Sequence, residues 1–160
     1  MNRLAHAALA LIACACLDAQ AATVCRIRQS GTVAFGAYDV TSPTPSDTAL
    51  DVVVSCSRDG GPPNVTITVA LGPSSTSGSV GSRRMRLLGG SDLLAYNLYR
   101  DQNRDGVWGQ TSGVDTVTRT INVPNKGTAL ATFTIYGRLA PLQDVTVGSY
   151  ADSLQITVTP

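Results

Sequence analysis

The sequence predicts an all-β protein folded as a single sandwich domain, and three observations support this. Every acidic residue is an aspartate, and Lys126 is the only lysine. Glutamate and lysine favour exposed helix faces, whereas aspartate favours turns. Short runs that alternate apolar and polar residues recur between glycines and prolines, as in sandwiches. No segment has the 3.6-residue apolar period of an amphipathic helix.

The clearest expected strand is Val65–Leu71, in which apolar residues alternate with threonine and alanine. Such alternation is typical of a strand with one buried face. Ser153–Thr159 repeats the pattern, with Leu154, Ile156 and Val158 on one face. The other expected strands are Thr32–Tyr38, Leu50–Ser57, Arg83–Leu88, Leu93–Arg100 and Thr128–Leu139.

The first 21 residues have the three parts of a secretory signal peptide. Arg3 provides the positive charge, Ala7–Leu17 is apolar, and Ala19-Gln20-Ala21 forms a small-residue cleavage site. We expect cleavage after Ala21 and one folded domain over residues 22–160. A lipidated Cys14 is one alternative, because Leu11-Ile12-Ala13-Cys14 resembles a lipobox. A membrane anchor is disfavoured, since the apolar run falls well short of the ~20 residues that span a bilayer.

The expected export of the chain predicts that its remaining cysteines form a disulfide. Cys14 and Cys16 lie in the signal segment, so Cys25 and Cys56 remain for a chain that enters an oxidising compartment. The bond would close a loop of about 32 residues and stabilise the fold by about 3–4 kcal/mol. The expected path is through the periplasm to the cell surface, a pilus or an extracellular coat.

The composition argues against an enzyme. The only histidine, His6, lies in the signal segment, so a nucleophilic serine or threonine would have no histidine base. No glycine-rich loop precedes a helix, as a phosphate site requires. The formal net charge of +1 gives no reason to expect a nucleic-acid partner. We therefore expect neither catalysis nor a cofactor.

One short motif resembles the start of a calcium loop. Asp101, Asn103 and Asp105, followed by Gly106, have the required spacing. A complete loop needs a bidentate glutamate eleven residues after the first aspartate, and Ser112 occupies that position. The same residue types are common in tight turns. The favoured interpretation is therefore a structural turn without metal, with these three residues as the calcium candidates.

The cluster Arg83, Arg84 and Arg86 has two interpretations. It could form an anion-binding patch, but residues 84 and 86 of a strand share one face while residue 83 points to the other. A solvated strand that protects a sheet edge is favoured, because positive charge deters edge-to-edge pairing.

An ordered set of residues along the chain resembles the spore coat protein U family, which includes the major subunits of archaic, Csu-type chaperone–usher pili. The resemblance covers essentially the whole of the predicted mature chain. The residues that carry it are Cys25, Phe35, Gly36, Tyr38, Val52–Cys56, Arg84, Met85, Leu94–Tyr99, Asp101, Trp108, Gly109, Ile135–Leu139, Gly148, Tyr150, Asp152 and Ile156–Val158.

The resemblance implies an immunoglobulin-like sandwich that lacks its final strand. In this family a periplasmic chaperone supplies that strand first, an outer-membrane usher assembles the fibre, and the N-terminal extension of a neighbouring subunit then replaces the chaperone. The implied roles are adhesion or biofilm formation. The family's cysteine pair maps onto Cys25 and Cys56. Aromatic residues expected to pack in the core or the groove are Phe35, Tyr38, Tyr96, Tyr99, Trp108, Tyr136 and Tyr150.

One departure from the family pattern affects the expected role. A polymerising pilin carries an alternating apolar extension of about a dozen residues before its first cysteine. Cleavage after Ala21 would leave only Ala22, Thr23 and Val24 before Cys25, a span of about 10 Å. The subunit is therefore expected to accept a strand but not donate one, as at a fibre tip. The alternative is a free-standing spore-coat or cell-surface matrix protein that binds polysaccharide.

Overall fold

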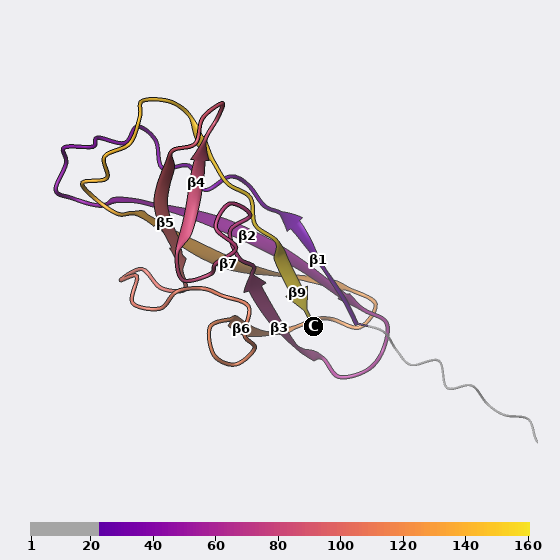
Figure 1. Ribbon diagram of the computed structural model, residues 1–160. Helices are drawn as coiled ribbons and strands as arrows, with labels where there is room; N and C mark the ends of the chain where they lie inside the picture. The colour runs from indigo at the N-terminus through magenta and orange to yellow at the C-terminus, as the bar shows by residue number, and fades with distance from the viewer. Residues whose placement is uncertain (1–22) are drawn as a thin grey trace, which may run out of the picture.

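The protein consists of two antiparallel β-sheets, seen in a computed structural model that describes residues 23–160 (Figure 1). The larger sheet has the strand order β1-β2-β7-β5-β4-β8, and the smaller has the order β6-β3-β9. Within residues 23–160 no helix is long and apolar enough to cross a membrane. The strands are β1 (Thr23–Gln29), β2 (Ser46–Arg58), β3 (Asn64–Leu71), β4 (Arg83–Leu87), β5 (Leu93–Tyr99), β6 (Val117–Asn122), β7 (Thr128–Leu139), β8 (Tyr150–Ala151) and β9 (Ile156–Thr159).

The strand order is that of an immunoglobulin-like sandwich with one position unfilled. Immunoglobulin domains place strands A, B, E and D in one sheet and C, F and G in the other. Strands β1, β2, β7 and β5 follow the A-B-E-D order, and β3 and β9 correspond to C and F. The last strand, G, would lie beside β9. In the described part of the chain β9 pairs only with β3, so that edge is open. The predicted fold class is confirmed.

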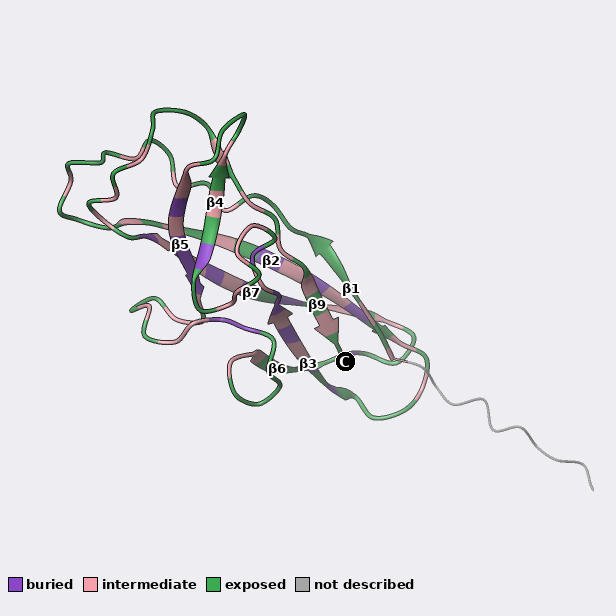
Figure 2. Ribbon diagram, viewed as in Figure 1, coloured by how far each residue is buried: buried purple, intermediate pink, exposed green. Residues whose placement is uncertain are grey.

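The core lies between the inner faces of the two sheets. β2 contributes Val52 and Val54, β3 contributes Ile67, and β7 contributes Phe133, all with no exposed surface. Along these strands buried residues alternate with more exposed ones, as the purple bands of Figure 2 show. This alternation follows from the two-residue side-chain period of a strand.

Besides the two-residue strand β8, which was not expected, three segments differ from the expectations. Thr32–Tyr38 is not a strand but an irregular stretch that follows β1. Its alternating pattern does describe which side chains turn inward, since Val33 and Phe35 pack against the core. β1 and β6 were not expected. The outward residues Arg26 and Arg28 of β1 and the run of Thr118, Arg119 and Thr120 in β6 make both segments look like polar loops.

The arginine cluster was correctly divided between two faces, but its solvated interpretation holds only for Arg84 and Arg86, which are exposed. Arg83 is completely buried. It lies in β4 directly opposite Tyr96 of β5, so its side chain enters the sandwich. Nothing in the local sequence pattern indicates that hydrogen-bond acceptors inside the sandwich surround its guanidinium.

Backbone carbonyls satisfy most of the buried guanidinium. Its Nη2 donates to the carbonyl oxygens of Gly72 at 2.9 Å, Trp108 at 2.8 Å and Leu71 at 3.2 Å, and its Nη1 donates to Asn97 Oδ1 at 2.7 Å. Among the described residues no carboxylate forms a salt bridge with it, and Nε has no partner. Burial lowers the pKa of Arg83 below its usual value. Arg83 thus connects the end of β3, β5 and the loop that carries Trp108.

Candidate functional site

The candidate site is an apolar groove along the open side of the sandwich. One wall is the stretch 31–40 that follows β1, and the other is the stretch 145–156 that leads into β9. The groove has two parts. The lower part, beside residues 152–156, has a volume of about 280 Å³, and the upper part, beside residues 145–150, has a volume of about 550 Å³. The two parts adjoin, because four residues line both of them: Thr32, Val33, Phe35 and Met85.

The floor of the groove is the inner face of the larger sheet. Leu50, Leu98 and Ile135 line the lower part, and Leu94 and Leu139 line the upper part. A complete sandwich would cover these residues with a strand of the second sheet. Leu50 on β2 remains partly exposed, as do Leu154 and Ile156 on the opposite wall.

The wall that leads into β9 carries an unpaired strand edge. Gly72 N–H donates to the Gln155 carbonyl at 2.8 Å, and Ala70 lies opposite Thr157. Because the backbone groups of successive residues in an antiparallel strand point to opposite sides, the N–H and C=O groups of Leu154, Ile156 and Val158 point away from β3. β1 lies near this edge (Figure 1). In the described residues neither edge pairs with a strand across the gap.

Gly137 in β7 allows the other wall, the stretch 31–40, to pack closely against the larger sheet. A methyl group at Gly137 would lie 2.9 Å from atoms of both Val33 and Phe35, which is too close for carbon atoms. The Phe35 ring also meets the Tyr96 ring edge-on, with centroids 5.9 Å apart. An isolated glycine inside an apolar strand pattern often marks such a close approach, so Gly137 could have been identified from the sequence.

Tyr96 is held in place by a carboxylate at the rim of the groove. Its hydroxyl donates to Asp152 Oδ2 at 2.7 Å, and Asp152 Oδ1 accepts from the Ser75 hydroxyl at 2.8 Å and the Thr76 N–H at 3.1 Å. Burial, followed by the bond to Asp152, raises the pKa of Tyr96 above its usual value. Tyr96 therefore stays a neutral hydrogen-bond donor in the groove wall.

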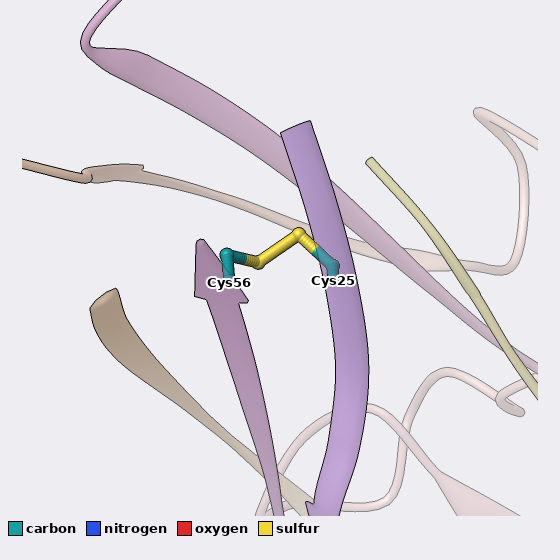
Figure 3. The surroundings of a disulfide bond; sticks show 2 residues. All are labelled: Cys25 and Cys56. Carbon is teal, nitrogen blue, oxygen red and sulfur yellow. A yellow bond between two sulfur atoms is a disulfide. The ribbon is translucent and has the colours of Figure 1, made fainter. Parts of the chain in front are cut away.

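The predicted disulfide between Cys25 and Cys56 is confirmed (Figure 3). The two residues lie directly opposite each other on β1 and β2, with Cα atoms 4.0 Å apart. β1 otherwise has few buried contacts, because only Thr23 and Cys25 are even partly buried. The disulfide therefore holds β1 on the larger sheet, and the stretch 31–40, the first wall of the groove, follows β1 in the chain.

The seven predicted aromatic residues fall into three places. Phe35, Tyr38, Tyr96 and Tyr150 line the groove. Trp108 lies in the core, fully buried, and its indole N–H donates to the Val69 carbonyl at 2.9 Å.

Tyr99 and Tyr136 form a cross-strand pair between β5 and β7. They alternate with the buried residues Leu98 and Ile135 and lie on the outer face of the larger sheet. The interpretation of these two as core or groove residues is therefore wrong. The Arg104 guanidinium carbon lies 6.0 Å from the centroid of the Tyr136 ring.

The calcium candidates form a turn. Asp101 accepts hydrogen bonds from the N–H groups of Asp105 at 3.1 Å and Gly106 at 2.9 Å, and these bonds lower the pKa of Asp101. Arg104 has a positive φ of 65°, as expected within a tight turn. No group of three or more histidine, cysteine, aspartate or glutamate side chains suited to a metal occurs in residues 23–160.

The predicted cleavage site, the signal segment 1–21 and Cys14 lie outside the described residues. Val145 lines the upper part of the groove and was not among the predicted site residues. An apolar residue is equally typical of the core, and only the tertiary structure shows that Val145 borders a groove.

Comparisons with known proteins place the chain in a family. A family model described as Spore Coat Protein U domain matches residues 11–157. Protein U of Myxococcus xanthus is 32% identical over 141 residues, which cover 81% of this chain and 72% of that protein.

Among solved structures, a chain from the chaperone–tip adhesin complex of CFA/I fimbriae biogenesis shares 13% identity at a TM-score of 0.39. The match covers 86% of this chain, which spans only 42% of that chain. Similarity at this level does not establish a shared fold, so the fold assignment rests on the strand order described above. The family model and the sequence identity to Protein U agree along nearly the whole chain, and the protein belongs to the Spore Coat Protein U domain family.

Proposed function

We propose that the protein is a non-enzymatic surface subunit of an archaic, Csu-type chaperone–usher pilus and that its groove accepts a strand donated by a neighbouring subunit. The observation that carries this proposal is the groove between the stretches 31–40 and 145–156, which combines an apolar floor with the unpaired edge of β9. A sheet edge of this kind recruits an added strand, because main-chain hydrogen bonds supply affinity and alternate side chains enter pockets.

Leu154, Ile156 and Val158 would be the main-chain partners of the added strand, since their N–H and C=O groups point away from β3. The inward side chains of the donor would pack on the floor and cover Leu50, which is partly exposed. A periplasmic chaperone would occupy the groove first and an outer-membrane usher would exchange it for the donor. Membership of the Spore Coat Protein U domain family supports the proposal of these partners. The signal segment would direct export, and the assembled pilus would act in adhesion or biofilm formation.

The proposed position in the fibre is terminal. If cleavage follows Ala21, only Ala22 precedes β1, which begins at Thr23. β1 pairs with β2 from Thr23 to Gln29 and is joined to it by the disulfide at Cys25. The residues that a donor subunit would extend into its neighbour are therefore committed to this subunit's own sheet, which favours an acceptor at the tip.

A second candidate function is a free-standing coat or matrix protein that binds polysaccharide. One observation favours it: the outer face of the small sheet carries no charged residue among its paired positions. Thr66 and Thr68 on β3 bond through their hydroxyls to Thr120 and Thr118 on β6 at 3.0 and 3.2 Å. Thr159 continues this face on β9. A neutral hydroxyl surface would suit a hydrated, uncharged polymer.

Peptide binding tests the proposal. An unlabelled peptide with alternating apolar residues, copied from the N-terminus of a neighbouring pilin, should bind the protein and raise its melting temperature. Val33→Asp should abolish binding, because it places a charge in the apolar wall. Val114→Asp is the matched control, since Val114 is 67% exposed and lies outside the groove.

If circular dichroism shows that Val33→Asp is unfolded, the test uses a backbone N-methylated peptide instead of the protein variant. This peptide keeps its side chains but loses its backbone N–H donors. The proposal predicts no binding of the methylated form to the unaltered protein. If the protein is a stable soluble monomer that does not bind the unmodified peptide, the strand-acceptor function is refuted and the function as a free-standing coat protein is favoured.

A further inference from the structure

The groove differs in width and chemistry along its length. The upper part, beside residues 145–150, has about twice the volume of the lower part, 550 against 280 Å³. No charged residue lines the upper part, whereas the carboxylate of Asp152 borders the lower part. A donated strand presents equally spaced side chains, so the two parts cannot be filled equally well by side chains of one size.

Three aromatic rings surround the upper part: Phe35 and Tyr38 on one wall and Tyr150 on the other. The floor consists of Met85, Leu94 and Leu139. Aromatic rings prefer edge-to-face or offset contacts with one another, worth more than their buried area alone. A cavity with this lining is chemically matched to a further ring.

Hydrogen bonds fix the Tyr38 wall of the upper part. The Tyr38 hydroxyl donates to the Ala140 carbonyl at 2.8 Å and accepts from the Gln143 N–H at 2.9 Å. The side chain of Gln143 in turn bonds both the N–H and the carbonyl of Ala95 on β5, at 2.7 and 2.9 Å, as an adjacent strand would.

The opposite wall is fixed in a similar way. Asp92 accepts bonds from both the N–H and the hydroxyl of Thr146, and the Tyr150 hydroxyl donates to the Thr146 carbonyl at 2.7 Å. Because both walls are fastened to the sandwich, the cavity is formed before a strand arrives, and filling it carries little ordering cost.

We infer that the upper part is a selectivity pocket for one large aromatic side chain at the end of the donated strand that lies beside residues 145–150. The narrower lower part accepts aliphatic side chains. This inference rests on the proposed strand-acceptor function and adds to it the chemistry that distinguishes the correct donor from other alternating apolar strands. The partner is a subunit whose donor segment carries phenylalanine, tyrosine or tryptophan at that single position.

A peptide series tests this. The parent peptide has valine at each of about five inward positions, and each variant carries phenylalanine at one of them. Phenylalanine at the terminal position that reaches the upper part should lower Kd about tenfold, because it buries more apolar surface there. Phenylalanine at central positions should weaken binding, because the lower part cannot hold the ring. Isothermal titration calorimetry on the mature protein measures each Kd.

A variant of the protein locates the effect. Val145 lines the upper part, so Val145→Phe should fill it and bring the Kd of the terminal-phenylalanine peptide to that of the valine parent. Val114→Phe makes the same change at an exposed site outside the groove and should preserve the advantage. Equal affinities across the series, or a gain only at a central position, would overturn the inference and leave strand acceptance intact. Failure of every peptide, the parent included, would overturn both.

Discussion

Replacing Arg83 by methionine tests how the buried guanidinium contributes to stability. Two effects oppose each other. Removing an unpaired buried charge relieves a desolvation cost, and a well-packed apolar substitute can then be neutral or stabilising. Against this, methionine leaves the carbonyls of Leu71, Gly72 and Trp108 without this donor, whereas the Asn97 amide oxygen loses Arg83 but still accepts from the Leu98 N–H. Each buried acceptor that loses its partner costs about 1–3 kcal/mol.

The loss of hydrogen bonds should outweigh the relief of desolvation, because three buried carbonyls lose their donor and no carboxylate in the described residues forms a salt bridge with Arg83. We expect Arg83→Met to lower the free energy of unfolding by at least about 3 kcal/mol. The melting temperature of a domain of this size should then fall by roughly 6–12 °C.

Urea and thermal unfolding measure the effect. Arg84→Met is the matched control: it makes the same change at the next residue, which is exposed, and should change stability by less than about 0.5 kcal/mol. Equal or greater stability of Arg83→Met would show that desolvation of the charge outweighs its hydrogen bonds, and would refute the reasoning.

Three further predictions follow. Oxidised protein should show no reactive thiol when unfolded without reductant, and Cys56→Ala should lower the free energy of unfolding by about 3–4 kcal/mol; two reactive thiols would contradict the disulfide. Millimolar calcium should leave the melting temperature unchanged, because Asp101 already accepts two backbone N–H groups; a rise of several degrees that disappears in Asp101→Ala would show a metal site. The hydrogen bond from Arg138 lowers the pKa of Asp47 below its usual value of 3.8. Burial acts in the opposite direction, and attraction to Arg104 lowers the pKa further. The stability that this carboxylate provides is therefore present above pH 3.8 and is lost as the pH falls through the lower folded value. Asp47→Asn should flatten the acid side of a stability–pH profile, and an unchanged profile would exclude this contribution.

The sequence by itself determined the fold class, the disulfide and most of the strands. Alternation in Val65–Leu71 and Thr128–Leu139 reports a local property, the side-chain period of a strand with one buried face, and needs no knowledge of neighbouring strands. The pairing of Cys25 with Cys56 was predicted by counting, because only two cysteines lie beyond the expected signal segment.

Only the tertiary structure decided what those strands leave uncovered. Thr32–Tyr38 has a strand pattern but no strand beside it, because the position next to it is the open groove. Arg83 could be recognised as buried only once Leu71, Gly72 and Trp108, distant in sequence, were seen to converge on it. Tyr96 and Tyr136 look alike in the sequence, yet one lines the groove and the other faces outward. Local pattern fixes which residues share a face, whereas the order of strands in the sheets fixes what that face meets.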